Sequence, residues 1–82
     1  MPHPLTYDAV KGAKIVGARL VGAKQREAAM AAGVPFATVK LWLSKGRAYN
    51  AAPVAEREPA HAVLGAFAAD YDKAEEIGRA HV

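Results

Sequence analysis

The side chains that could carry out chemistry in this 82-residue chain are mainly charged ones: 11 Lys or Arg, 8 Asp or Glu, and 3 His. The absence of cysteine excludes a thiolate nucleophile, a thiolate metal site and a disulfide. His3, His61 and His81 lie far apart and show no metal-ligand spacing. The carboxylates gather late in the chain in a pattern typical of a solvated helix face: Asp70, Asp72, Glu75 and Glu76. We therefore expect no enzyme, and no metal ion, cofactor or small-molecule substrate.

The cations lie mostly in the first part of the chain. Residues 1–50 hold eight Lys or Arg against two acidic residues, whereas residues 51–82 hold three against six. This asymmetry favours a surface that faces a polyanion on one side of the molecule only. Many solvated helices are also basic, so the charge balance alone does not identify a nucleic acid.

The elements that must position these cations are predicted to be helices. Alanine is abundant, and no segment alternates with period two for long enough to form a strand. The first helix is expected to begin with Thr6 as its N-cap and Asp8 in its first turn, and to stop at Gly22. A short helix over residues 24–32 should stop at Gly33.

Two further helices are predicted after Gly33. One should run over residues 35–45 and stop at Gly46, and a longer one should start near residues 59–60 and reach residues 79–81. The fold class is therefore all-α, a three-helix core followed by a longer C-terminal helix. The corresponding divisions are a flexible arm (1–5), a helix-turn-helix domain (6–47), a loop (48–58) and a C-terminal helix (59–82).

Residues 25–44 have the pattern of a helix-turn-helix. Ala29 provides the small residue at which the second helix crosses closely, and Gly33 provides the residue that tolerates a positive φ at the turn. The expected inward positions are apolar: Ala28, Ala32, Val34, Val39, Trp42 and Leu43.

Several runs in this region resemble the DNA-binding domain of phage small terminase subunits. They are Gln25-Arg26-Glu27-Ala28-Ala29, Ala32-Gly33-Val34-Pro35 and the segment from Thr38 to Arg47. Related helix-turn-helix domains occur in phage and transposon regulators, and the segment 67–75 resembles the helix that follows this domain in small terminases. The resemblance implies binding of double-stranded DNA in genome packaging, or in phage regulation such as transcriptional control.

The sequence departs from this family in two respects. Lys24 and Pro35 stand where an N-capping Ser or Thr is usual. Small terminases also carry an oligomerisation region after this domain, whereas this sequence ends at Val82. It is expected to be either a fragment or a self-contained phage protein with another task.

The helix faces predict which residues meet DNA. Residues on the outward face of the third helix should reach base edges in the major groove: Phe36, Ala37, Lys40, Leu41 and Ser44. Phosphates should be met by Lys24, Gln25, Arg26, Thr38, Lys45 and Arg47. Three alternatives stay open: Phe36 packs in the core, Leu41 contacts a protein, and Lys40 and Lys45 are ordinary solvated residues.

The last helix has a narrow apolar seam at spacings of three and four: Leu64, Phe67, Tyr71, Ala74 and Gly78. It could pack back on the core, or it could form the seam of a homodimer or higher oligomer.

The competing hypothesis for the whole chain is a small helical phage module that binds a host protein and uses the helix-turn-helix only as a scaffold. No run is long and apolar enough for a membrane span, and we expect a cytoplasmic protein.

Overall fold

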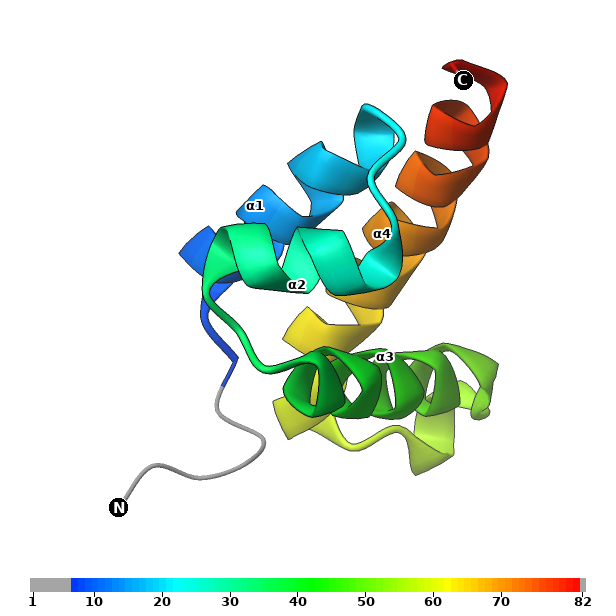
Figure 1. The fold of residues 1–82 in the computed structure, drawn as a ribbon. Helices are drawn as coiled ribbons and strands as arrows, with labels where there is room; N and C mark the ends of the chain where they lie inside the picture. The colour runs from blue at the N-terminus through cyan, green and yellow to red at the C-terminus, as the bar shows by residue number, and fades with distance from the viewer. Residues whose placement is uncertain (1–6, 82) are drawn as a thin grey trace.

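The computed structural model describes residues 7–81, which form a helical fold without strands in that range. Four α-helices are joined by short turns and by two 3₁₀ segments (Figure 1): α1 (Ala9–Leu20), α2 (Gln25–Ala32), α3 (Phe36–Ala51), η1 (Val54–Glu56), η2 (Pro59–His61) and α4 (Ala62–His81). The predicted all-α class with a longer C-terminal helix is confirmed. The predicted arm, residues 1–5, lies outside the described residues.

Helix α1 begins at a different residue from the one predicted. Asp8 is its N-cap, and its Oδ1 accepts hydrogen bonds from the backbone N–H of Val10 (2.9 Å) and Lys11 (3.1 Å). The prediction that Asp8 lies inside the first turn is therefore wrong, and Thr6 lies outside the described residues. Asp8 satisfies two amides that an α-helix leaves unpaired at its start. The predicted stop at Gly22 is confirmed by its φ of +92°.

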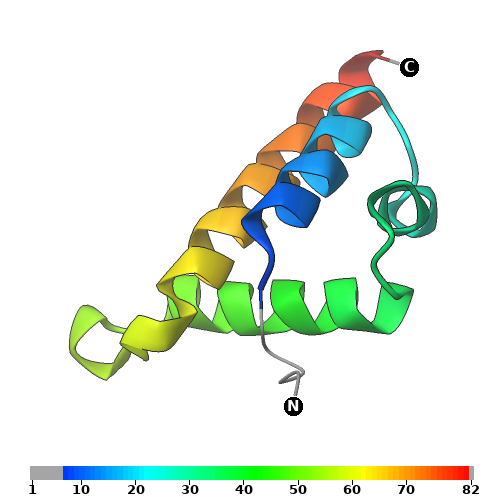
Figure 2. The ribbon, with the colours of Figure 1, turned by 90° about the vertical axis from the view of Figure 1, so that its left-hand side faces the viewer.

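The turn between α2 and α3 is formed as the sequence predicts. Gly33 has a φ of +73°, a conformation that costs glycine little. Its N–H donates to the carbonyl of Met30 (3.0 Å), and the N–H of Val34 donates to that of Ala29 (3.0 Å). These bonds close the C-terminus of α2 and turn the chain sharply into α3. Figure 2 shows α2 nearly end-on while α3 lies lengthwise, so the two helices cross steeply.

Helix α3 is longer than predicted, because Gly46 does not stop it. The helix runs on to Ala51, and Gly46 is buried where α4 packs against α3. A Cβ at position 46 would overlap the backbone carbonyl of Leu64 and lie 2.8 Å from the Cβ of Ala68. The glycine therefore allows two helices to approach, and the predicted loop begins only after α3 has ended.

The core is formed by the inward faces of all four helices. The expected helix-turn-helix positions are buried, from Val39 and Ala28 at 0% exposed to Ala32 and Val34 at 6%. Trp42 is a core residue as predicted, and it makes edge contacts with Tyr7 (ring centroids 4.9 Å apart) and Phe67 (5.9 Å).

The apolar seam of α4 faces this same core. Leu64, Phe67, Tyr71 and Ala74 are each 3% exposed or less, although α4 lies at the edge of the molecule in Figure 2. The chain's own helices α1 and α3 pack against α4. Of the two alternatives for this seam, the structure has the one in which it packs back on the core.

Candidate nucleic-acid interface

The outward face of α3 follows from its buried face. Val39, Trp42 and Leu43 point into the core, which leaves the opposite side of the helix to solvent. Of the five residues predicted to reach bases, three are exposed and two are half-buried. The exposed ones are Ala37, Lys40 and Ser44, and the half-buried ones are Phe36 and Leu41. The exposed part of this face therefore carries one cation, Lys40.

Phe36 has a structural role that the sequence left open. It packs against the edge of the core, and two cations lie near its ring. The guanidinium carbon of Arg26, from α2, is 4.6 Å from the ring centroid, and the Nζ of Lys40 is 5.6 Å away. Such cation–π contacts are worth about 0.5–1 kcal/mol at exposed sites. A cation from α2 and a cation from α3 therefore both lie beside this ring at the start of α3.

The residues predicted to contact phosphate lie on both helices of the unit. Lys24, Arg26, Lys45 and Arg47 are exposed, while Gln25 and Thr38 are half-buried. A shallow hollow of about 370 Å³ brings some of both predicted sets together, and its polar lining is Gln25, Lys40, Ser44 and Arg47. The start of α2 and the outward face of α3 therefore form one continuous surface.

The N-cap residues of α2 and α3, Lys24 and Pro35, make no side-chain capping hydrogen bond, as expected. At α2 the backbone N–H of Lys24 donates instead to Oε1 of Glu27 (2.9 Å). At α3 the carbonyl of Pro35 accepts from the N–H groups of Thr38 (3.0 Å) and Val39 (3.2 Å). Both helices therefore begin at defined positions beside the candidate surface.

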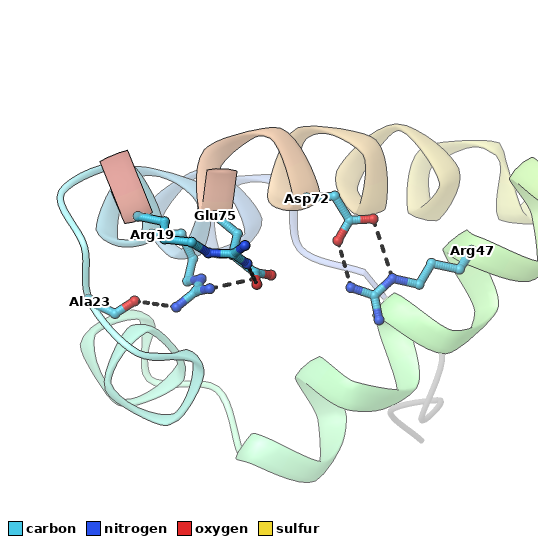
Figure 3. Close-up of polar contacts among 6 residues, drawn as sticks. Arg19, Ala23, Arg47, Asp72 and Glu75 are labelled. Carbon is cyan, nitrogen blue, oxygen red and sulfur yellow. Dashed lines mark hydrogen bonds and ion pairs between the residues drawn. The ribbon is translucent and has the colours of Figure 1, made fainter. Parts of the chain in front are cut away.

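Arg47 has a partner that sequence reasoning missed. Its Nη2 donates to Oδ1 of Asp72 at 2.6 Å and its Nε to Oδ2 at 3.4 Å, which forms a two-pronged ion pair between α3 and α4 (Figure 3). The hydrogen bond that the Arg47 guanidinium donates to Asp72 raises the pKa of the guanidinium, because it stabilises the charged form. Asp72 is 25 residues from Arg47 in the sequence, and no local spacing links the two.

A second ion pair lies further along α4. Arg19 is close to Glu75 (3.4 Å), and it also donates to the carbonyl of Ala23 (2.6 Å), as Figure 3 shows. Two acids of the second half of the chain therefore neutralise cations of the first half. The basic part of the chain is therefore not separated from the acidic part at this edge of the molecule.

Nothing in the described range resembles a metal centre. No group of three or more His, Asp or Glu side chains within residues 7–81 could hold an ion. His61 is half-buried, whereas His3 lies outside the described residues. None of the helices in residues 7–81 is long and apolar enough to cross a membrane.

No family model, curated protein or solved structure matched the chain.

Proposed function

We propose that the chain binds double-stranded DNA, with α3 in the major groove. The observation that carries the proposal is the cluster at the start of α3, where Arg26 and Lys40 flank Phe36 beside the exposed face of the helix. Helix-turn-helix proteins contact base edges with this part of the second helix. Here it combines hydrogen-bond donors, an apolar ring and an adjoining basic surface.

Each side chain has a defined task in this proposal. Lys40 donates to O6 and N7 of guanine, and Ser44 forms hydrogen bonds with base edges further along the groove. Ala37, with the exposed edges of Phe36 and Leu41, contacts thymine methyl groups. The phosphate contacts set affinity and salt dependence, and they come from Lys24, Gln25, Arg26, Thr38, Lys45 and Arg47.

We further propose a biological role from the resemblance to phage small terminase subunits. The chain would recognise DNA in the bacterial cytoplasm, in the initiation of genome packaging or as a phage regulator, including a regulator of transcription. In this proposal the α4 seam packs within the chain and is not the means of bringing two copies to one DNA site.

The proposal is tested by fluorescence anisotropy with a labelled random duplex at two salt concentrations. Lys24, Arg26 and Lys45 at phosphates predict that log K falls against log salt with a slope of about −2.7, and Arg47 as a fourth contact would make it about −3.6. Lys40→Glu should weaken binding at least about tenfold, because it places a carboxylate against the DNA. Lys73→Glu is the matched control, since Lys73 is exposed on α4. It should weaken binding much less.

Two results would reject the proposal. One is the absence of binding at micromolar protein in low salt, and the other is an equal loss for Lys40→Glu and Lys73→Glu. The second shows that only net charge matters and that α3 is not the contact.

One observation favours the competing proposal, a module that binds a host protein. The outward face of α3 has a single cation beside three apolar residues, Phe36, Ala37 and Leu41. In that case Leu41→Ala should abolish association with the partner and salt should matter little. Under the DNA proposal the same variant reduces affinity modestly and leaves the salt slope unchanged, because Leu41 carries no charge.

A further inference from the structure

Arg47, a cation of the candidate surface, already forms an ion pair with the carboxylate of Asp72. The guanidinium uses its fork of N–H groups on Asp72, the same geometry with which arginine binds a phosphate. Arg47 also lines the hollow that contains Gln25, Lys40 and Ser44. The Asp72 carboxylate therefore occupies the place that a backbone phosphate would take.

This pair is accessible to water and so can be exchanged. The side chains of Arg47 and Asp72 are 52% and 49% exposed. Ion pairs as exposed as this contribute little to the stability of a fold. A phosphate can reach the guanidinium without any helix moving.

The ion pair of Arg19 with Glu75 provides a comparison, because Arg19 is held in place by several contacts. Arg19 is 14% exposed, donates to the carbonyl of Ala23 and lies 5.2 Å from the ring centroid of Tyr71. Within residues 7–81, the side chain of Arg47 donates hydrogen bonds to Asp72 alone. Arg19 is thus a part of the packing, and Arg47 is held by one exchangeable carboxylate.

We infer that Asp72 competes with DNA phosphate for Arg47 and thereby limits the affinity of the chain for DNA of any sequence. The inference rests on the proposed function. Arg47 contributes to the binding of DNA only when a phosphate replaces the Asp72 carboxylate. A complex in which no phosphate lies at the guanidinium therefore gains less binding free energy from this arginine than a complex in which one does. Asp72 is in this sense a residue that sets specificity without touching a base.

The test compares Asp72→Asn with Asp70→Asn in the anisotropy assay with random duplex. Both variants remove one exposed negative charge from α4, but Asp70 lines the groove between α1 and α4 and has no contact with Arg47. Asp72→Asn should bind about two- to fivefold more tightly than Asp70→Asn at low salt. Its salt slope should be steeper by about 0.9, the value for one additional phosphate contact.

A second comparison removes the arginine. In an Arg47→Gln background, Asp72→Asn and Asp70→Asn should have the same effect, because no competition remains. Circular dichroism checks that each variant is folded, and Asp72→Ser repeats the measurement if Asp72→Asn loosens α4.

The outcomes separate the two ideas. If the wild-type chain binds DNA and Asp72→Asn equals Asp70→Asn in affinity and slope, the competition is refuted and the proposed function stands. An advantage of Asp72→Asn that persists without Arg47 also refutes it. If neither the wild-type chain nor any variant binds, the proposed function fails and the inference fails with it.

Discussion

Two glycines inside helices should respond in opposite ways to the same substitution. Gly17 in α1 and Gly46 in α3 both lie in helical conformations, where alanine is favoured by about 1 kcal/mol. A Cβ at position 17 would meet no atom within 4 Å. A Cβ at position 46 would overlap the Leu64 carbonyl, which belongs to the rigid backbone of α4 and cannot rotate away.

The magnitudes follow from these surroundings. Gly17→Ala should stabilise the chain by about 0.5–1 kcal/mol, the full gain in helix propensity. Overpacking in a core costs about 1–3 kcal/mol, and an overlap with rigid backbone belongs at the upper end, about 2–3 kcal/mol. Gly46→Ala should therefore be destabilising by about 1–2.5 kcal/mol after that gain is subtracted. For a chain of this size 1 kcal/mol corresponds to about 4–8 °C in Tm. The two variants should therefore differ by about 6 °C or more.

Urea denaturation followed by circular dichroism, together with the thermal midpoint, measures both effects. The m-value should stay constant, because neither change alters the surface that unfolding exposes. A Gly46→Ala variant as stable as the wild type or more stable would refute the close approach of α3 and α4 at this position. A destabilised Gly17→Ala variant would show that α1 is packed differently along its exposed side.

Two further predictions concern the start of α1 and the buried phenols. Asp8→Ala should lower the free energy of unfolding by about 1 kcal/mol through the loss of two capping hydrogen bonds, whereas Asp8→Asn, which retains a capping oxygen, should lose only a few tenths; urea titration distinguishes them. Burial raises the pKa of Tyr7 and of Tyr71 above the ordinary value of 10.0, so their contribution to stability is present below pH 10 and is lost as the pH rises through the folded-state pKa values. The urea midpoint should fall above pH 10, and Tyr7→Phe should reduce that fall; an equal fall in both proteins would contradict the burial of this phenol.

The local parts of the fold could be predicted because their causes are local. A glycine four residues after Ala29, followed by Val34, defines the turn after α2 by backbone geometry alone. The spacing of Val39, Trp42 and Leu43 likewise assigns the buried face of α3 without reference to the rest of the chain.

Gly46 shows where such reasoning ends. The sequence does not distinguish a glycine that ends a helix from a glycine at which another helix crosses. At position 46 only the location of Leu64, on the helix that crosses, distinguishes them. The α4 seam was ambiguous in the same way, because the spacing of apolar residues does not determine whether the surface that covers them belongs to the same chain or to another.

The sequence predicted which residues belong to the candidate site, but not which of them contact one another. The outward face of α3 identified Lys40 and Ser44 as exposed residues. The placement of Arg26 at the ring of Phe36 depends on how α2 crosses α3, and the Arg47–Asp72 pair depends on how α4 returns along α3. Both are tertiary facts that spacing within one helix does not contain.

The position of Trp42 has a practical consequence. It is the only tryptophan in the chain, and it is 3% exposed among aromatic rings from before α1 and from α4. Its fluorescence and its near-ultraviolet dichroism therefore report on the packing of three parts of the chain at once. The indole lies on the side of α3 opposite Lys40, so a ligand on the outward face has no direct route to quench it. Its emission can follow the integrity of the core during a binding titration, independently of the signal from the ligand.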